Sequence, residues 1–229
     1  MRDLEPALRK GLAELGLALG DGQIAQLLDY LALIQKWTRV YNLTAVRNPA
    51  EMLTHHLLDS LAVVPPLLRQ LAELPPPLPG EATATLRLLD VGSGAGLPGV
   101  VIAICCPEIM VDCVDTVAKK VAFIRQAAAT LELANLHGLH ARVESLTGPY
   151  QVISARAFAS LADFTQLSLA ALAPHGIWLA MKAKNPADEI AVLSAQVQVF
   201  HVEQLFVPGL EAERCIVWAR VTAASQAHS

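Results

Sequence analysis

The feature that most constrains this chain is a glycine-rich stretch between a strand-like run and a helix-like run. The apolar run Leu86–Leu89 ends in Asp90 and leads into residues 91–99, which read Val-Gly-Ser-Gly-Ala-Gly-Leu-Pro-Gly. Glycines at a strand-to-helix turn let the backbone approach a ligand closely, and free amides at the helix start attract negative charge. We therefore expect a strand, a ligand-binding turn and a helix in this order.

From Leu86 onward, short apolar runs alternate with amphipathic segments. The strand-like runs are Leu86–Val91, Ile109–Val114, Leu136–Leu139, Tyr150–Ser154 and Gly176–Met181, and the helix-like segments are Leu97–Cys106, Val117–Leu131, Leu161–Leu172 and Ala187–Ala195. This alternation is typical of a mostly parallel sheet with helices on both faces. The end of the chain differs, because only Pro208–Arg214 separates the runs Val197–Val207 and Cys215–Val221. Parallel neighbours need a crossover of a dozen residues or more, so these runs predict an antiparallel hairpin at the sheet edge.

The first part of the chain has a helical pattern. Apolar residues recur at three- and four-residue spacing after Asp21, the expected N-cap, at Ile24, Leu27, Leu28, Leu31 and Ile34. Asn48-Pro49 predicts a second helix start. The proline-rich stretch Leu74–Thr85 can continue neither a helix nor a central strand. We predict a helical subdomain over residues 1–73, a linker over 74–85 and a sheet domain over 86–229.

An acidic residue is expected at the end of the second strand. Asp115 follows Gly92 by 23 residues, and a carboxylate there can accept hydrogen bonds from both hydroxyls of an adenosine ribose. Enzymes that use S-adenosylmethionine and enzymes that use a nicotinamide dinucleotide both combine a glycine turn with such an acid, so the turn does not tell the two classes apart. The predicted C-terminal hairpin favours the first class, because a dinucleotide fold needs a second mononucleotide-binding half in its place. We predict the α/β class I fold of S-adenosylmethionine-dependent methyltransferases, with a seven-stranded sheet.

Two further segments should lie at the carboxyl edge of this sheet. Arg142-Val143-Glu144 follows the third strand, where adenine would lie, and Arg156 ends the fourth strand. Arg156 could hold the cofactor carboxylate or an RNA phosphate. Residues 154–160 contain no histidine, acid or cysteine. An acceptor with a free lone pair, such as guanine N7, needs none of these, so we expect catalysis by positioning, without a general base.

Other classes of protein fit the sequence poorly. The chain begins with charged residues, and its longest apolar runs fall short of the ~20 residues of a membrane span. Its four cysteines show neither CxxC pairing nor zinc spacing with histidine, so we expect reduced thiols and no metal site; they are Cys105, Cys106, Cys113 and Cys215. We expect a soluble, cytoplasmic protein without a membrane partner.

Several motifs in order resemble the bacterial 16S rRNA guanine-N7 methyltransferase family, RsmG, also called GidB. They are Tyr41–Arg47, Glu51–Leu53, His56–Ser60, Asp90–Gly99 and Arg156–Leu161. The resemblance extends from about residue 20 to about residue 220. It implies methylation of N7 of one guanine, position 527 in the usual 16S numbering, with S-adenosylmethionine as the methyl donor.

The resemblance also implies which residues bind the cofactor. They are Gly92, Leu97, Asp115, Val143, Glu144 and Arg156, and we add Gly94 and Gly96 from the same turn. The chain departs from the family pattern at three positions. His55 stands where arginine is common, Ala183 where glycine is common, and Cys215 where histidine is common. The first two departures concern the expected RNA contact, and the third has no interpretation.

The charge total alone argues against an RNA partner. Lys plus Arg number 17 and Asp plus Glu 21, a net charge of −4, whereas phosphates attract cations. The acids are concentrated late, however, with five acids and no base in Asp188–Glu213, whereas residues 30–50 hold three bases and no acid. We predict RNA contacts at Lys36, Arg39, Arg47, His55 and Lys182.

The expected partner is 16S rRNA, naked or within the small ribosomal subunit, and we expect the protein to act as a monomer. One alternative is an S-adenosylmethionine enzyme for a small molecule, with the N-terminal helices as a lid. Another is a nucleotide-binding module without catalysis. The basic stretch from Lys36 to Arg47 favours RNA over the lid, and the pairing of Gly92 with Asp115 and Arg156 disfavours the binding module.

Overall fold

The computed structural model describes residues 1–74, 85–156, 158 and 160–222. All of the predicted linker except its two end residues lies outside the described residues. The N-terminal helical elements are η1 (Arg2–Leu4), α1 (Glu5–Glu14), α2 (Asp21–Tyr41), α3 (Pro49–Met52), the π-helical turn η2 (Leu53–Leu58), α4 (Asp59–Leu61) and α5 (Val64–Glu73). The remaining helical elements are α6 (Gly99–Cys105), α7 (Ala118–Thr130), η3 (Val143–Ser145), α8 (Leu161–Ser168), η4 (Leu169–Ala171) and α9 (Ala187–Ala191).

The starts of two N-terminal helices follow from local hydrogen bonds. Gly20 precedes the first helical residue of α2, so the prediction that Asp21 is the N-cap is wrong by one position. The Gly20 amide donates to Gln23 Oε1 at 3.1 Å, while Asp21 lies in the first turn, where its charge favours the helix dipole. Asn48 caps α3 as expected, because its Oδ1 accepts from the Ala50 amide at 2.9 Å.

The seven strands form one sheet in the order β3-β2-β1-β4-β5-β7-β6. They are β1 (Arg87–Val91), β2 (Met110–Asp115), β3 (Leu136–His140), β4 (Tyr150–Arg156), β5 (Leu172–Lys182), β6 (Val197–Gln204) and β7 (Cys215–Val221). The first five strands are mutually parallel, and β7 is antiparallel to both β5 and β6. The predicted C-terminal hairpin is therefore confirmed, with β7 inserted between β5 and the edge strand β6.

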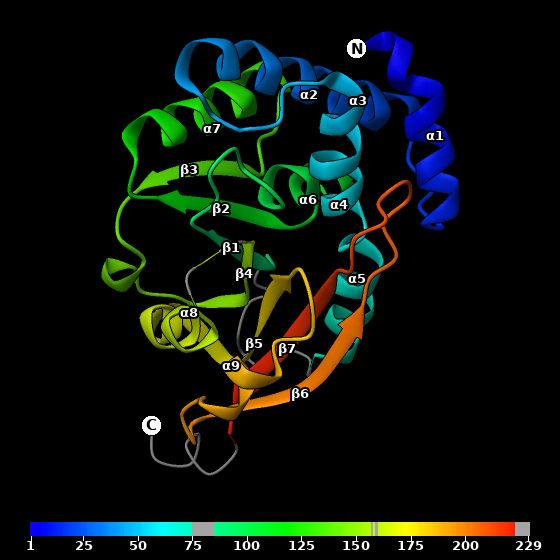
Figure 1. The fold of residues 1–229 in the computed structure, drawn as a ribbon. Helices are drawn as coiled ribbons and strands as arrows, with labels where there is room; N and C mark the ends of the chain where they lie inside the picture. The colour runs from blue at the N-terminus through cyan, green and yellow to red at the C-terminus, as the bar shows by residue number, and fades with distance from the viewer. Residues whose placement is uncertain (75–84, 157, 159, 223–229) are drawn as a thin grey trace.

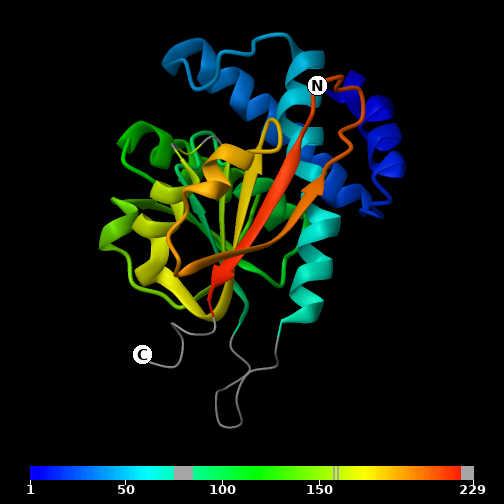
Figure 2. The ribbon, with the colours of Figure 1, turned by 60° about the horizontal axis from the view of Figure 1, so that its bottom comes forward.

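Helices pack on both faces of this sheet (Figure 1). On one face, α2, α6 and α7 share a continuous core in which Tyr30 and Leu27 of α2 join Val100 of α6 and Phe123 of α7. On the other face, α8 and the 3-10 turns cover a smaller core that includes Trp178. Figure 2 shows α2 and α5 lying against the rest of the molecule. Because the larger core is shared, the subdomain boundary proposed from the sequence stays a prediction.

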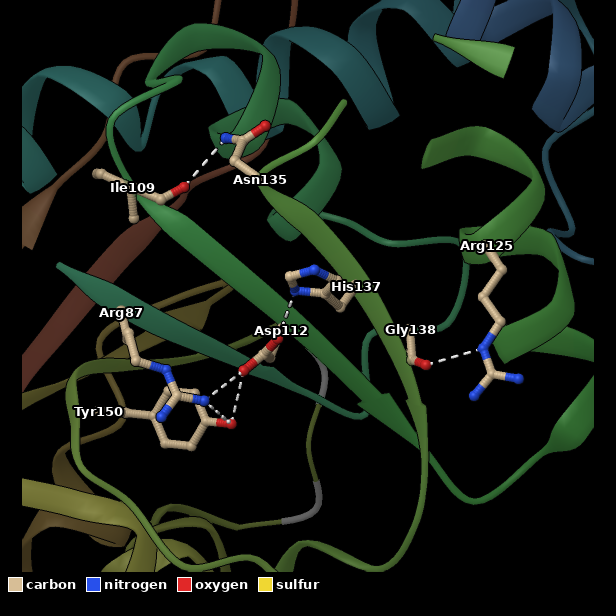
Figure 3. A network of polar contacts seen from close by, with 8 residues as sticks. All are labelled: Arg87, Ile109, Asp112, Arg125, Asn135, His137, Gly138 and Tyr150. Carbon is tan, nitrogen blue, oxygen red and sulfur yellow. Dashed lines mark hydrogen bonds and ion pairs between the residues drawn. The ribbon is translucent and has the colours of Figure 1, made fainter. Parts of the chain in front are cut away.

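A polar network occupies the amino ends of the first four strands (Figure 3). The Asp112 carboxylate accepts hydrogen bonds from the Tyr150 hydroxyl at 2.7 Å and from Arg87 Nη2 at 2.8 Å. The ring of His137 lies 3.1 Å from the other carboxylate oxygen. Arg87 also lies over the ring of Tyr150, 4.3 Å from its centroid. These contacts pair the polar groups at this edge of the sheet with one another, at the opposite ends of the strands from the glycine turn.

Within the described ranges, no helix combines the length and the apolar character that crossing a bilayer requires.

Candidate functional site

The carboxyl ends of β2, β1 and β4 meet at one edge of the sheet. Val91, the last residue of β1, pairs with Val114 of β2 on one side and with Ala155 of β4 on the other. The residues that follow, Gly92, Asp115 and Arg156, therefore lie along the same edge. The structure thus brings together the three groups that the sequence predicted to surround a cofactor.

The glycine turn has a backbone that other residues adopt only with strain. Gly92, Gly94 and Gly96 have φ values of 63°, 59° and 82°, in the left-handed region that favours glycine. A Cβ at Gly96 would also lie 2.4 Å from Cγ2 of Val100. Leu97 differs from its neighbours in the turn, because its side chain is buried in the larger core. The three glycines keep the turn narrow and its amides free of side chains.

Asp115 lies beside this turn and is 6% exposed. Its Oδ2 accepts from the Gly94 amide at 3.1 Å, and its Oδ1 accepts from the Val117 amide at 2.9 Å. Lys120 Nζ lies 3.4 Å from Oδ2. A carboxylate offers about four acceptor positions. Asp115 uses three of them within the chain, so it fixes the turn and keeps about one for a ligand hydroxyl.

Asp90, the residue before the last in β1, supports the glycine turn and is fully buried. Its Oδ2 accepts from the Gly99 amide at 3.1 Å, and its Oδ1 accepts from the Ser154 hydroxyl at 2.8 Å. The carboxyl thus joins the end of β1 to the start of α6 and to β4. Burial raises the pKa of Asp90 to about 6, against an ordinary value of 3.8. The sequence prediction assigned Asp90 no role, although an acid inside an apolar strand was the available signal.

Tyr30 of α2 also holds the glycine turn. Its hydroxyl is buried and donates to the carbonyls of Ala95 at 2.5 Å and Gly96 at 3.2 Å. Two glutamines of α2 also donate to backbone carbonyls. Gln23 donates to Ile104, near the end of α6, at 2.9 Å, and Gln26 donates to Leu131, just after α7, at 2.8 Å. Residues at this spacing share one helix face. These three side chains therefore fix α2 against the sheet domain and the turn, a role that the sequence prediction missed.

Arg156 is attached to the N-terminal helical elements. Its Nη1 donates to the His55 carbonyl at 3.1 Å and to Asp59 Oδ2 at 3.1 Å. The other Asp59 oxygen accepts from Nε of Arg214 at 2.8 Å. Asp59 is 3% exposed, so it is a buried carboxylate shared by two arginines. Asp59 and Arg214 were not among the predicted site residues.

The segment after β3 forms the short turn η3. Val143 is buried, and Glu144 is exposed at the same edge of the sheet. Glu144 pairs with Arg142 at 3.3 Å. Its own backbone amide, and to a smaller extent Arg142, lower the pKa of this carboxyl. Glu144 is therefore an ionised acceptor close to the third strand end, as an adenine contact requires.

These groups fit the adenosyl cofactor that the sequence predicted. The turn presents a narrow backbone of glycines, and the buried carboxylate of Asp115 lies directly beside it. Glu144 and Arg156 lie at the ends of the neighbouring segments. Such a set can bind a ribose, a base edge and a carboxylate side by side.

Three of the predicted RNA contacts surround the C-terminal end of α2. Lys36 and Arg39 are exposed, and neither makes a hydrogen bond or an ion pair with any residue that the structure describes. Arg47 is exposed as well, and its Nη2 donates to Asn42 Oδ1 at 2.8 Å. Their charges are therefore available to an external anion.

The other two predicted RNA contacts are less accessible. His55 is partly buried in η2. Lys182 Nζ donates to both carboxylate oxygens of Glu189, at 2.9 Å and 2.8 Å, and its side chain is 16% exposed. Glu189 therefore neutralises Lys182 within the chain, and the role of these two residues in RNA binding stays a prediction.

The cysteines of the chain are free thiols. Burial raises the pKa of Cys106 to about 12 and also raises the pKa of Cys113, so both remain protonated near neutral pH. Across the ranges that the structure covers, no three side chains of His, Cys, Asp or Glu are grouped as metal ligands would be.

Comparison with known proteins gives matches over nearly the whole chain. The sequence model of the GidB family, described as rRNA small subunit methyltransferase G, matches residues 23–217. The ribosomal RNA small subunit methyltransferase G of Albidiferax ferrireducens is 78% identical over 223 residues, which are 97% of this chain and 100% of that protein. The protein of the same name from Acidovorax sp. (strain JS42) is 68% identical over 222 residues, 96% of each chain.

Two solved structures resemble the fold at low sequence identity. TrmN from Thermus thermophilus has a TM-score of 0.54 at 19% identity, over 74% of this chain and 53% of that chain. A TehB-like S-adenosylmethionine-dependent methyltransferase from Corynebacterium glutamicum has a TM-score of 0.50 at 12% identity, over 85% and 99%. Together with the strand order, these confirm the predicted class I fold.

We predict that Asp115→Ala weakens binding of S-adenosylhomocysteine at least tenfold. Hydrogen bonds to a charged group contribute about 1.5–3 kcal/mol each, and about 1.4 kcal/mol is tenfold in affinity. Isothermal titration calorimetry measures the effect. Glu108→Ala, at an exposed turn before the other end of β2, is the control and should bind normally. Wild-type affinity in Asp115→Ala would contradict the assignment of the ribose to this carboxylate.

We also predict that Asp90 makes stability depend on pH. Because the pKa of Asp90 is about 6 in the folded protein and 3.8 ordinarily, the folded state binds this proton more tightly. The contribution of Asp90 to stability therefore falls as pH rises from below 3.8 to above 6, by about 3 kcal/mol in all. In Asp90→Asn this fall is absent. The free energy of unfolding of the variant minus that of the wild type should rise by about 2 kcal/mol between pH 4 and pH 7.

Urea denaturation at several pH values measures this difference. Asp188→Asn, an exposed position on α9, is the matched control for the change of charge. If the difference in the free energy of unfolding between Asp90→Asn and wild type stays constant with pH, the prediction is wrong and the carboxyl of Asp90 ionises as an exposed one does.

Proposed function

Because this chain belongs to the GidB family, rRNA small subunit methyltransferase G, we propose that it transfers a methyl group from S-adenosylmethionine to 16S ribosomal RNA. We place the acceptor at N7 of one guanine, position 527 in the usual 16S numbering. One structural observation supports the proposal above the others. The helix that holds the glycine turn through Tyr30, α2, ends in the exposed cations Lys36 and Arg39.

Each residue at this edge would bind a different part of the cofactor. The glycine turn would lie against the amino-acid part, Asp115 would bind the ribose, and Val143 and Glu144 would contact the adenine. Arg156, held by Asp59, would bind a carboxylate. When bound, S-adenosylmethionine supplies an electrophilic methyl group.

The chemistry of the acceptor explains why positioning suffices. Guanine N7 carries a free lone pair, so no side chain has to remove a proton from it. The buried carboxylates of Asp90 and Asp59 instead fix the turn and Arg156 in place. A preorganised site of this kind lowers the barrier through orientation and fixed dipoles. The proposal therefore includes no general base.

The course of α2 supports RNA as the substrate. Gln23 and Gln26 bind carbonyls of Ile104 and Leu131, where α6 and α7 have returned to the amino edge of the sheet. Tyr30 binds the glycine turn at the carboxyl edge. At 1.5 Å per residue, Arg39 lies about 13 Å further along the same helix. The helix therefore carries Arg39 beyond the cofactor turn, toward the space that a large substrate would occupy.

We propose that the protein acts in the cytoplasm as a monomer, on 16S rRNA either naked or in the small subunit. An enzyme for a small molecule would use the N-terminal helices as a lid. The exposed and unpaired Lys36 and Arg39 favour RNA, because a lid over a small substrate needs no cations on its outer surface.

The direct test of the function uses labelled S-adenosylmethionine with purified protein and with either 16S rRNA or 30S particles. We expect label in the RNA, and chemical cleavage at 7-methylguanosine should give one site, at position 527. Absence of label from both substrates would contradict the proposal. Label at another nucleotide would contradict the assignment of the target.

We predict that Arg39→Glu weakens RNA binding at least tenfold at low salt and leaves the affinity for S-adenosylhomocysteine unchanged. Reversal of one charge removes a phosphate attraction and adds a repulsion. Filter binding and calorimetry measure the two affinities. Arg220→Glu makes the same change at the opposite edge of the sheet, near the end of β7, and should bind RNA normally. If cofactor binding also collapsed in Arg39→Glu, the separation of the two surfaces would be wrong.

A further inference from the structure

A small cavity lies beside the basic end of α2, apart from the cofactor turn. Its volume is about 160 Å³, roughly five times the 30 Å³ that a water molecule occupies in the liquid. It is lined by Gln35, Thr38, Arg39, Val46, Arg47 and Met52. None of the described residues that line the cavity is acidic, so their charged groups are the two arginines.

Thr38 is the unusual member of this lining. It is 3% exposed, and its hydroxyl has no hydrogen-bond partner in the described part of the chain. Hydroxyls inside helices usually bond to the carbonyl four residues earlier. Thr165 and Ser168 of α8 do so, at 2.9 Å and 2.6 Å. The unpaired hydroxyl of Thr38 therefore costs stability in the free protein.

The other polar groups of the cavity are also uncommitted. Gln35 and Arg39 make no hydrogen bond with any described residue. Arg47 uses one nitrogen for Asn42 Oδ1, and a guanidinium has five N–H donors in all. Two guanidinium groups without an acid between them bind phosphate oxygens well, and a neighbouring hydroxyl adds a donor.

We propose that this cavity, which we call the Thr38 pocket, binds one phosphate group of the RNA substrate. The guanidinium groups of Arg39 and Arg47 donate to the phosphate oxygens, and the hydroxyl of Thr38, which is buried and unpaired in the free protein, gains a partner when the phosphate enters. The proposal rests on the proposed function, since it takes RNA as the substrate. The pocket fixes one point of the RNA backbone beside the cofactor edge, so it positions the substrate without reading its sequence.

The variant Thr38→Val tests the pocket, because valine keeps the shape and removes the hydroxyl. We expect the KM for the RNA substrate to rise about tenfold, with the KM for S-adenosylmethionine unchanged. We also expect the melting temperature to stay the same or to rise, because an unpaired hydroxyl leaves the interior. Thr165→Val is the matched control, since it removes a hydroxyl that is hydrogen-bonded. It should lower the melting temperature and leave the KM for RNA unchanged.

The salt dependence of RNA binding in Arg47→Gln gives a second readout. Loss of one phosphate contact should reduce the slope of log K against log salt concentration by about 0.7 to 0.9. An unchanged slope would overturn the phosphate assignment. If Thr38→Val keeps the wild-type KM for RNA while the wild type methylates 16S rRNA, the pocket proposal is wrong and the proposed function stands. If the wild type methylates no RNA, the proposed function itself is wrong.

Discussion

The left-handed backbone of the glycine turn is the constraint on which the site depends. Three glycines of positive φ follow one another closely after β1, and glycines, which have the greatest backbone freedom, do not hold such a conformation by themselves. Asp90 bonds to the start of α6, Asp115 bonds to Gly94, and Tyr30 bonds to the carbonyls of Ala95 and Gly96. The three side chains come from β1, β2 and α2, so the sheet and the N-terminal helices jointly fix the turn.

The N-terminal helices therefore belong to the site rather than only adjoining it. The core beneath α2 is continuous with the core beneath α6 and α7. Asp59 of α4 binds Arg156 at the end of β4 and Arg214 just before β7. A helix held at several points along its length transmits position well. The same helix that supports the cofactor turn ends in the exposed cations and the Thr38 pocket. The proposed cofactor and RNA sites are thus related through one rigid element.

Much of the architecture could be predicted from local pattern. The alternation of strand-like and helix-like runs gave the parallel part of the sheet, and the short connection Pro208–Arg214 gave the antiparallel hairpin. The predicted N-cap, Asp21, was wrong by one residue, because Gly20 takes this position and its amide bonds to Gln23. The pattern of strand ends predicted Gly92, Asp115, Glu144 and Arg156 as cofactor contacts, and the resemblance to a known family implied the same residues and Leu97. The sheet register places Gly92, Asp115 and Arg156 at one edge.

The contacts that hold the site together could not be predicted in this way. Tyr30 and Ala95 are 65 residues apart, and Asp59 and Arg214 are 155 apart. The hydrophobic pattern of the sequence does not predict such pairs, because each depends on how distant segments pack. Lys182 shows the converse, since its position after β5 suggested an RNA contact whereas its charge is paired with Glu189. The unpaired hydroxyl of Thr38 likewise emerges only from the packed structure.

A crystal structure of the protein with S-adenosylhomocysteine would locate the cofactor site directly. We expect the ligand along the carboxyl edge of β1, β2 and β4, with its ribose hydroxyls within hydrogen-bond distance of Asp115 and its adenine beside Val143 and Glu144. The turn should keep the left-handed backbone at Gly92, Gly94 and Gly96. A ligand bound at another edge, or a ribose that does not contact Asp115, would contradict the central claim.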